Sequence, residues 1–397
     1  MTYFDDLETR SADDREAQQL DALNGQLALI AKAENSCLPD FGTLTSLADL
    51  AKLPVLRKSE LAKWQKDTPP LGGIPTRNVT RLFQSPGPIY EPGGSGTDWW
   101  RFSRFLHAVG IGSGDVVQNT FSYHFTPAGA MFESAAIGVG ATVFPAGTGQ
   151  TELQVEAAAA LGVTAYAGTP DYLGAILEKA DSMGVDLSKI TKAAVSGGPL
   201  FPQVRQNYAD RGVTCLQCYG TADVGHIAYE SAAMDGMIVE ETAIVEIVTP
   251  GTGIPVSEGE IGEVVVTCLN PDYPLIRFGT GDLSAVMPGT SPCGRTNTRI
   301  VGWRGRADQA TKIKGMFVRP EQVARFVDRH PEIDRARVEV THDGKGDAML
   351  VKIEAAEPNG ADYANSIRDV FKLRADIQFV GKGELPRDGV VIADLRE

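Results

Sequence analysis

The chain has 397 residues, of which 43% are hydrophobic and 22% are charged, and its formal net charge is −14 at pH 7. This length predicts two globular domains, and the acidic balance argues against nucleic acid as a partner, because such binding depends on Lys and Arg that neutralise phosphates. No apolar run approaches the ~20 residues that cross a bilayer, so neither nucleic acid nor membrane is an expected partner.

The N-terminal part of the chain divides into a helical region and a loop. Residues 1–65 are charged and rich in Ala and Leu, and the spacing of Leu20, Leu23 and Leu27 predicts a helix. Residues 68–96 contain several Pro and Gly pairs, which predict a long loop with little regular structure. A loop of that length inside a compact domain is usually functional or disordered.

Residues 99–219 alternate between helical and strand patterns, which predicts a largely parallel sheet covered by helices on both faces. Ligands bind such sheets where strands end and glycine-rich loops begin. Three strand ends have this character, at 121–125, 196–199 and 219–223. The expected helices span 99–109, 128–138, 152–161, 171–183 and 203–210, and the expected strands span 116–121, 141–144, 165–167, 192–196 and 214–219.

The pattern changes after residue 225. Short alternating runs at 244–248 and 262–267 predict antiparallel strands. The fold class is therefore α/β: a large N-terminal domain (1–304) with mostly parallel, helix-covered sheets plus a small antiparallel subdomain, and a small C-terminal α+β domain (305–397). In the C-terminal domain, strands are expected at 311–314, 337–341, 348–354 and 376–380, and helices at 321–329 and 361–373.

The cysteines and the N-terminus indicate a cytoplasmic protein. Residues 1–6 are acidic where a secretory signal would be basic and then apolar. The five cysteines are an odd and scattered set, which is typical of reduced thiols. Cys215 and Cys218 form a C-x-x-C pair within a strand-like run, and the second pair of a zinc ribbon is absent. Buried strand thiols are therefore favoured over a metal or redox site.

Three motifs stand in collinear order along the chain. Residues 219–223 are Tyr-Gly-Thr-Ala-Asp, residues 277–283 are Arg-Phe-Gly-Thr-Gly-Asp-Leu, and Gly-Arg-Ala-Asp at 305–308 is followed by Lys-Ile-Lys-Gly-Met-Phe-Val at 312–318. Together they resemble the adenylate-forming superfamily in its phenylacetate–CoA ligase-like branch, over about residues 56–387. The resemblance implies a ligase that uses ATP with magnesium to form an acyl-adenylate and passes the acyl group to coenzyme A.

The resemblance also implies roles for individual residues. Tyr219 would pack on adenine, Asp282 would accept hydrogen bonds from both ribose hydroxyls, and Asp223 would hold magnesium with a catalytic role. Asp308 would be the hinge about which a mobile C-terminal domain swings, and Lys314 would be catalytic. The other expected cofactor-binding residues are Ser196, Gly197, Gly198, Gly220, Thr221 and Arg306.

The same branch places residues against its acyl or aryl group at the positions of Tyr123, His124 and Phe125. Tyr172 would form a further wall of this acyl pocket, and His226, which follows shortly after Asp223, is another candidate for lining it. Catalytic and structural roles are both open for His124, which could hydrogen-bond a carboxylate, act as a base, or serve as a hydrogen-bonded structural residue. The expected partner is a small carboxylic acid or its acyl-CoA, and a homodimer is expected because dimers are common in this branch.

Two departures separate the chain from the pattern. The family's phosphate loop reads approximately Ser-Ser-Gly-Thr-Thr-Gly-Lys-Pro, whereas residues 85–92 here are Ser-Pro-Gly-Pro-Ile-Tyr-Glu-Pro. The prolines remove backbone donors, and Glu91 replaces the Lys, so attraction to the phosphates would become repulsion if Glu91 faced them. A unit charge ~4 Å from another contributes roughly 4 kcal/mol at an effective dielectric of about 20. The family's C-terminal Pro-Arg-x-x-Gly-Lys is also incomplete, because residues 385–390 contain no Lys and Lys382 is out of register.

Three interpretations therefore remain open. The first is a CoA ligase that forms an acyl-adenylate. The second is a relative that does not adenylate and acts on a preformed acyl-CoA or acyl-adenylate. The third is a non-catalytic protein that binds an acid or an acyl-CoA.

Overall fold

The computed structural model describes residues 3–33, 36–86, 88–307, 309, 311–313, 316–342, 347–355 and 362–396. The chain forms two compact units, the first of residues 1–245, 266–278 and 287–302, and the second of residues 246–265, 279–286 and 303–397. The expected boundary at 304/305 lies close to the division at 302/303, while two earlier segments also belong to the second unit. None of the helices in the described part of the chain combines the length and apolarity that a bilayer span requires.

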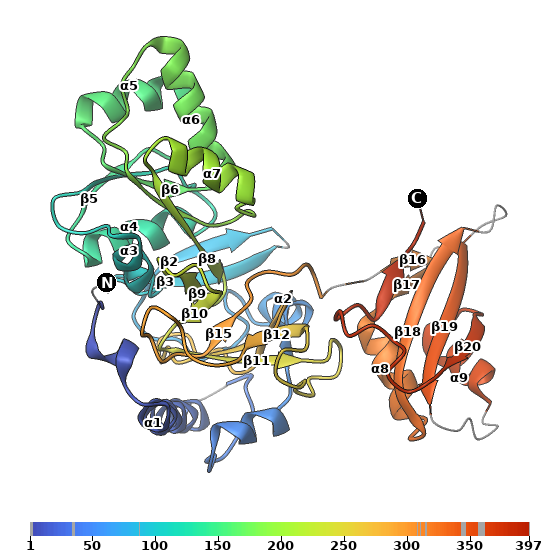
Figure 1. The fold of residues 1–397 in the computed structure, drawn as a ribbon. Coiled ribbons are helices and arrows are strands. Elements are labelled where there is room, and N and C mark those ends of the chain that lie inside the picture. The colour runs from blue at the N-terminus through green and yellow to red at the C-terminus, as the bar shows by residue number, and fades with distance from the viewer. Residues whose placement is uncertain are drawn as a thin grey trace. The chain divides into compact units, whose positions relative to one another are not determined.

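A nine-stranded sheet in the order β14-β15-β10-β9-β8-β7-β6-β4-β5 dominates the first unit. The strands from β8 to β5 are parallel and alternate along the chain with helices, as the sequence predicts (Figure 1). The parallel strands are β4 (Val116–Asn119), β5 (Thr142–Pro145), β6 (Ala165–Gly168), β7 (Lys192–Val195) and β8 (Thr214–Thr221), and the helices are α4 (Ala128–Gly138), α5 (Thr151–Leu161), α6 (Pro170–Met183) and α7 (Pro202–Asp210). The remaining strands are β9 (Gly225–Glu230), β10 (Met237–Val239), β14 (Val286–Met287) and β15 (Arg299–Ile300).

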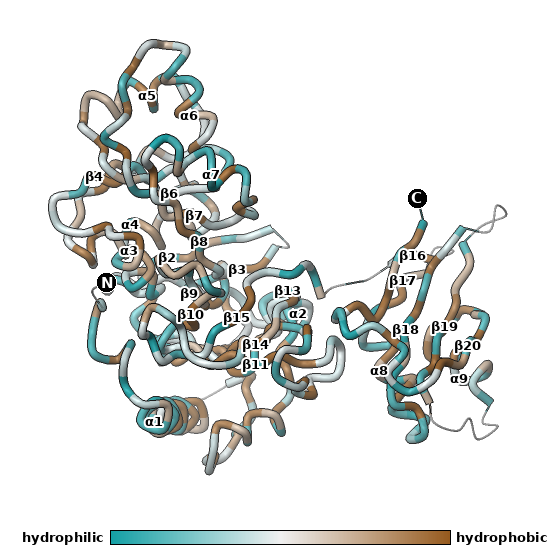
Figure 2. Tube along the Cα trace, in the orientation of Figure 1, coloured by the Kyte–Doolittle hydropathy of each residue, from teal (hydrophilic) through white to brown (hydrophobic). Residues whose placement is uncertain are grey.

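The central strands β6 and β7 are buried on both faces of the sheet, and apart from Lys192 at the start of β7 their residues are apolar. Ala165 and Ala167 belong to one hydrophobic cluster, whereas Tyr166, between them, belongs to another. Because successive side chains of a strand point to opposite faces, the two clusters lie on opposite sides of the sheet. Figure 2 shows hydrophobic residues along these strands. The α/β prediction for this region is confirmed.

The prediction of an irregular loop over residues 68–96 is wrong. A hairpin of β2 (Val79–Ser85) and β3 (Ile89–Gly94) occupies much of it, with Ser85 opposite Ile89. The prolines do not prevent pairing, because an isolated two-stranded ribbon leaves one edge of each strand unpaired and Pro fits there. Pro92 lies in β3, opposite Leu82.

The helix expected at residues 99–109 begins later, as α3 (Ser103–Val109). Both carboxylate oxygens of Asp98 accept hydrogen bonds from Ser103 N, at 3.0 and 3.1 Å. Arg101 has a φ of +69°, which lies in the left-handed region and interrupts a helix at that point. The other N-terminal elements are α1 (Ala12–Ala31), α2 (Lys58–Asp67) and two short 3-10 helices, Asp6–Thr9 and Leu47–Lys52.

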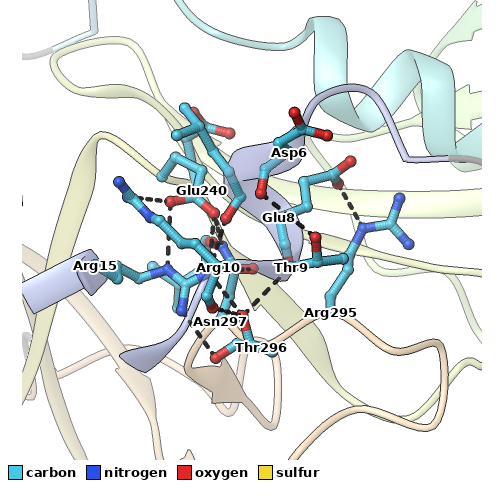
Figure 3. Close-up of polar contacts among 12 residues, drawn as sticks. Asp6, Glu8, Thr9, Arg10, Arg15, Glu240, Arg295, Thr296 and Asn297 are labelled. Atoms are coloured by element: carbon cyan, nitrogen blue, oxygen red, sulfur yellow. Dashed lines mark hydrogen bonds and ion pairs between the residues drawn. The ribbon is translucent and has the colours of Figure 1, made fainter. Parts of the chain in front are cut away.

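Buried ion pairs anchor the N-terminal segment in the first unit, as Figure 3 shows. Glu8 is fully buried and accepts hydrogen bonds from the Tyr229 hydroxyl at 2.6 Å and from Arg295 Nε at 2.5 Å. Arg15, on α1, donates to Glu241 Oε1 at 3.3 Å. Since an isolated buried charge is costly, each partner stabilises the other in place.

The second unit contains a separate α+β fold. Strands β18 and β19 are antiparallel, whereas β20 and β21 add in parallel at the two edges of this sheet, in the order β20-β19-β18-β21. Helices α8 and α9 contribute Phe326 and Phe371 to its core. The bounds are β16 (Thr311–Ile313), β17 (Met316–Val318), α8 (Pro320–Asp328), β18 (Ile333–His342), β19 (Asp347–Ala355), α9 (Tyr363–Phe371), β20 (Asp376–Val380) and β21 (Ile392–Asp394).

A further four-stranded sheet has the order β1-β13-β12-β11. It contains the two runs that the sequence predicts as strands between residues 240 and 270. Its strands are β1 (Leu56–Arg57), β11 (Ala243–Val248), β12 (Gly262–Cys268) and β13 (Phe278–Ser284).

Candidate functional site

Parallel pairing brings most of the predicted site to one edge of the nine-stranded sheet. Strands β4, β6, β7 and β8 are parallel neighbours, so their carboxyl ends meet at the same edge. The segments at these ends are 120–125, 169–172, 196–199 and 219–223. The structure therefore brings the first motif to the same edge as four of the expected acyl-binding residues, Tyr123, His124, Phe125 and Tyr172.

The segment after β4 holds Tyr123 and presents two side chains to solvent. The Tyr123 hydroxyl accepts a hydrogen bond from Asn119 Nδ2 at 2.8 Å, and burial together with the nearby Glu133 raises its pKa. His124 is exposed, and Phe125 is 71% exposed with a φ of +63°. Tyr123 is thus fixed in its place, while the other two side chains are accessible to a ligand.

The segments after β6 and β7 are held by hydrogen bonds to neighbouring backbone. The Tyr172 hydroxyl donates to Gly149 O at 2.7 Å, and Ser196 Oγ donates to Cys218 O at 3.1 Å. Gly197 has a φ of +75° and is exposed, so a side chain is disfavoured where the chain turns beside the strand end. Ser196 therefore ties the end of β7 to β8.

A tight turn at the end of β8 positions Asp223. The β8–β9 ladder shifts register between Tyr219 and Gly220. A Cβ atom on Gly220 would lie 2.7 Å from Gly225 O, so only glycine fits there. Thr221 Oγ1 accepts a hydrogen bond from Val224 N at 3.1 Å and closes the turn. Asp223 is 5% exposed.

Lys58 is a residue of this site that sequence reasoning missed. It begins α2, and its Nζ lies 2.9 Å from Asp223 Oδ2, with the lysine side chain 40% exposed. This contact is an ion pair rather than a well-aligned hydrogen bond, because neither Asp223 oxygen accepts a hydrogen bond from the described residues. The two residues lie far apart in the sequence, so no local pattern links them.

Glu91, which replaces the phosphate-loop lysine, is fully buried on β3 beside the same group. Its Oε1 accepts a hydrogen bond from the Ser85 hydroxyl, and its Oε2 has no hydrogen-bond partner in the described part of the chain. The pKa of Glu91 is raised to about 7, because burial and the negative charge of Asp223 raise it by more than the hydrogen bond from Ser85 and the positive charge of Lys58 lower it. Glu91 therefore lies in the interior, where its carboxyl group is influenced by the charges of Asp223 and Lys58.

The magnesium ion that the family implies fits these donors. The oxygens of Asp223 and Glu91 Oε2 are buried carboxylate oxygens without hydrogen-bond partners, which is the chemistry that a hard divalent cation requires. No cluster of three or more His, Cys, Asp or Glu gathers among the described residues. An ion here would therefore complete its coordination shell with hydroxyl, water or phosphate oxygens.

His226 lies within the core instead of at a surface. Its ring is fully buried and stacks on Phe102 at 4.7 Å, and Nδ1 lies 2.9 Å from Arg101 O. Burial lowers its pKa to about 3, so the ring is neutral near pH 7. In this arrangement His226 can influence a ligand only through the residues that cover it.

In the second unit, Asp282 is held by the segment that contains the third motif. Its Oδ1 accepts hydrogen bonds from Trp303 Nε1 at 3.1 Å and from Arg306 Nη1 at 2.9 Å. Asp282 is 8% exposed, whereas the Arg306 side chain is 54% exposed. The expected hinge Asp308 and catalytic Lys314 lie outside the described residues.

In the C-terminal segment, the two cations nearest to the position of the family's lysine, Arg387 and Lys382, both lie close to carboxylates. Arg387 Nη1 pairs with Glu260 at 2.7 Å, and Asp388 accepts from Arg337 at 3.0 Å. Lys382 is exposed, 3.5 Å from Asp334. The described charges of this segment are thus engaged within the second unit.

The two cysteines of the C-x-x-C pair are free and buried on β8, as predicted. Burial raises the pKa of Cys215 to about 12 and also raises the pKa of Cys218. Both are therefore protonated thiols near pH 7, without the thiolate that metal binding needs.

Comparisons with known proteins agree on the type of fold and site. The model of AMP-binding enzymes matches residues 97–268. The phenylacetate–coenzyme A ligase of Aromatoleum evansii is 30% identical over 329 residues, covering 78% of this chain and 73% of that protein. The Escherichia coli K12 phenylacetate–coenzyme A ligase is 27% identical over 423 residues, covering 97% and 95%.

A solved structure of 2-hydroxyisobutyryl-CoA ligase, in an open conformation with 2-HIB-AMP and CoA, superposes with a TM-score of 0.70 at 21% identity. It covers 96% of this chain and 91% of that one. At this level of identity the likeness shows the fold alone.

Proposed function

This chain belongs to the phenylacetate–CoA ligase family of AMP-binding enzymes and is acyl/aryl-CoA ligase-like, and from this premise we propose its reaction. The chain activates a small carboxylic acid, aromatic rather than aliphatic, as an acyl-adenylate and transfers the acyl group to coenzyme A. The acid class follows from the aromatic side chains at the end of β4, Tyr123 and Phe125.

The proposed reaction has two half-reactions. A carboxylate oxygen attacks the α-phosphorus of ATP and forms the acyl-adenylate, while pyrophosphate leaves. The sulfur of coenzyme A then attacks the acyl carbonyl carbon, loses its proton to solvent, and forms the thioester while AMP leaves. Magnesium, when bound, neutralises phosphate charge.

In this reaction the chain's own residues bind and orient the reactants. Tyr219 packs on adenine, Asp282 accepts hydrogen bonds from the ribose hydroxyls, and the turn that carries Asp223 faces the phosphates. Lys314 stabilises the charge that develops on the α-phosphate. His124 donates a hydrogen bond to the acid's carboxylate.

The proposal is supported most by one observation: the segment expected to bind the acyl group and the turn expected to face the phosphates lie at the same edge of the sheet. The loop of Tyr123 follows β4, and the turn of Asp223 ends β8, which belongs to the same parallel array. Lys58 adds a cation 2.9 Å from Asp223. A positive charge is thus present at the phosphate end, although the loop itself has lost its lysine.

Glu91 supports a second candidate function. Its carboxylate occupies the region where the family's loop supplies a lysine to ATP, and no replacement lysine appears at residues 385–390. A chain built in this way would bind a triphosphate weakly. It could instead transfer the acyl group of a preformed acyl-adenylate or acyl-CoA.

Titration calorimetry combined with product analysis separates these candidates. ATP with magnesium, AMP and benzoyl-CoA are titrated separately, and a panel of aryl, arylacetic and short aliphatic acids is then incubated with ATP and CoA. Micromolar ATP binding with acyl-CoA product supports the ligase. Benzoyl-CoA binding without ATP affinity supports the second candidate, and acid binding without turnover under any cosubstrate would overturn both.

We also propose that the protein is cytoplasmic, because of its scattered free cysteines, and homodimeric, as members of the branch commonly are. Light scattering on the purified chain tests the dimer, for which the expected mass is twice that of the 42.4 kDa chain.

A further inference from the structure

In the second unit, one oxygen of the carboxylate assigned to ribose already accepts two hydrogen bonds. Asp282 Oδ1 accepts one from Trp303 Nε1 at 3.1 Å and one from Arg306 Nη1 at 2.9 Å. An ionised carboxylate has about two acceptor sites on each oxygen, and Asp282 is 8% exposed. A ribose hydroxyl that donates to this oxygen therefore has to replace one of the two donors.

Arg306 is the donor that the surrounding structure holds in place, although its side chain is 54% exposed. Its guanidinium carries the charge opposite to that of Asp282, and the two residues also form a β-bridge. The guanidinium lies against Gly281, where a Cβ atom would be 2.8 Å from Arg306 Nη2. Ala307 N donates to Gly281 O at 2.8 Å and fixes the backbone beside it. Arg306 therefore stays on Asp282 when a ligand binds.

Trp303 is the donor that a ligand can displace at little cost. Its side chain is uncharged and 53% exposed, so its indole N–H can hydrogen-bond to water after it leaves Asp282. The backbone next to it is fixed, because Arg304 N donates to Leu283 O at 2.8 Å. Release of the contact therefore requires only rotation of the Trp303 side chain, which is fast for exposed residues.

We propose that the indole N–H of Trp303 occupies the ribose acceptor of Asp282 in the nucleotide-free protein, and that ribose binds by displacing it. This inference rests on the proposed function, which assigns Asp282 to the ribose hydroxyls. The contact makes Trp303 a determinant of nucleotide affinity, because every nucleotide with these hydroxyls has to break it. A nucleotide without them does not donate to Asp282 Oδ1, so its affinity does not depend on Trp303.

Titration calorimetry of the full-length protein with AMP and with 2′,3′-dideoxy-AMP tests the proposal. Trp303→Phe removes the indole N–H and keeps an aromatic ring. This variant should bind AMP about three- to tenfold more tightly than the wild type, which is the range expected for one hydrogen bond. It should bind dideoxy-AMP with the affinity of the wild type. An AMP affinity that is unchanged or lower, or an equal gain for both nucleotides, would overturn the proposal.

Trp99→Phe is the matched control, because Trp99 Nε1 also donates to a carboxylate oxygen, Asp272 Oδ2, at 3.2 Å in the first unit. Its affinity for AMP should equal that of the wild type. A second measurement follows the indole signals of the four tryptophans by nitrogen-15 NMR. AMP should shift the signal that Trp303→Phe lacks, whereas dideoxy-AMP should leave it in place, and a signal that AMP does not move would overturn the proposal. Trp303→Leu supplies the same assignment and the same comparison if the Phe variant does not fold.

The outcome can be separated from that of the ligase assay. A gain in AMP affinity in Trp303→Phe, without acyl-CoA formation by the wild type, would leave the contact in place and count against the proposed function. Acyl-CoA formation without that gain would do the reverse. Absence of AMP binding in the wild type and in both Trp303 variants would overturn the proposal together with the ribose assignment.

Discussion

Replacing Asp282 by alanine should separate nucleotide recognition from folding in the second unit. Asp282 Oδ1 accepts hydrogen bonds from Trp303 Nε1 and Arg306 Nη1. The Arg306 side chain is 54% exposed, so solvent screens this ion pair and its loss should cost at most about 1 kcal/mol of stability. Trp303 is 53% exposed, and its indole N–H can bond water instead.

The expected effect on nucleotide binding is larger. Hydrogen bonds to a charged group contribute about 1.5–3 kcal/mol each, and every 1.4 kcal/mol corresponds to about tenfold in affinity. Loss of even one ribose contact should therefore weaken AMP binding by at least about tenfold. The melting temperature should change little.

Calorimetry with AMP and with 2′,3′-dideoxy-AMP measures the contact directly. The wild type should prefer AMP by at least about tenfold, and Asp282→Ala should bind both ligands with equal, weak affinity. Asp388→Ala is a suitable control, because Asp388 also pairs with an arginine of the second unit, at 3.0 Å, and has no expected ligand contact. An Asp282→Ala variant that still prefers AMP would refute the ribose assignment.

Three further changes test the described contacts. Lys58→Met and Asp223→Asn should be non-additive in a double-mutant cycle of thermal stability, because each removes the same ion pair; additive effects would contradict the pairing. Glu8→Ala should cost ~3–5 kcal/mol and lower the melting temperature, since it leaves the buried Arg295 unpaired; an unchanged melting temperature would count against the N-terminal anchor. The pKa of His226 is lowered to about 3 in the folded protein, so the stability that its neutral form contributes is complete above about pH 6.5 and is lost as the pH falls toward 3. Between pH 6.5 and 5, His226→Gln should therefore lose less stability than the wild type. An equal loss in both proteins would exclude His226 as the source.

The alternating part of the chain was predictable because its local and long-range requirements coincide. The helix expected at 128–138 is α4, residue for residue. The strands Ala165–Gly168 and Lys192–Val195 are short and, apart from Lys192, apolar and buried, which is the composition of central parallel strands. Since parallel strands share one edge, the gathering of the strand-end segments was predictable as well.

Other features depend on contacts that no local pattern records. The β2–β3 hairpin was obscured by Pro and Gly, which usually indicate loops but here lie in the turn and on free strand edges. The start of α3 depends on the side chain of Asp98. The pairing of Lys58 with Asp223 joins residues far apart in the sequence, and the interior position of Glu91 follows from the hairpin that carries it.

Exchange of labelled pyrophosphate into ATP, measured with the purified chain in the presence of magnesium and an arylacetic acid, tests adenylate formation most directly, because exchange requires the first half-reaction to run in both directions. We expect exchange that depends on the acid and is lost in Asp223→Asn. Absence of acid-dependent exchange across aryl, arylacetic and short aliphatic acids, in a protein that still binds acyl-CoA, would contradict it.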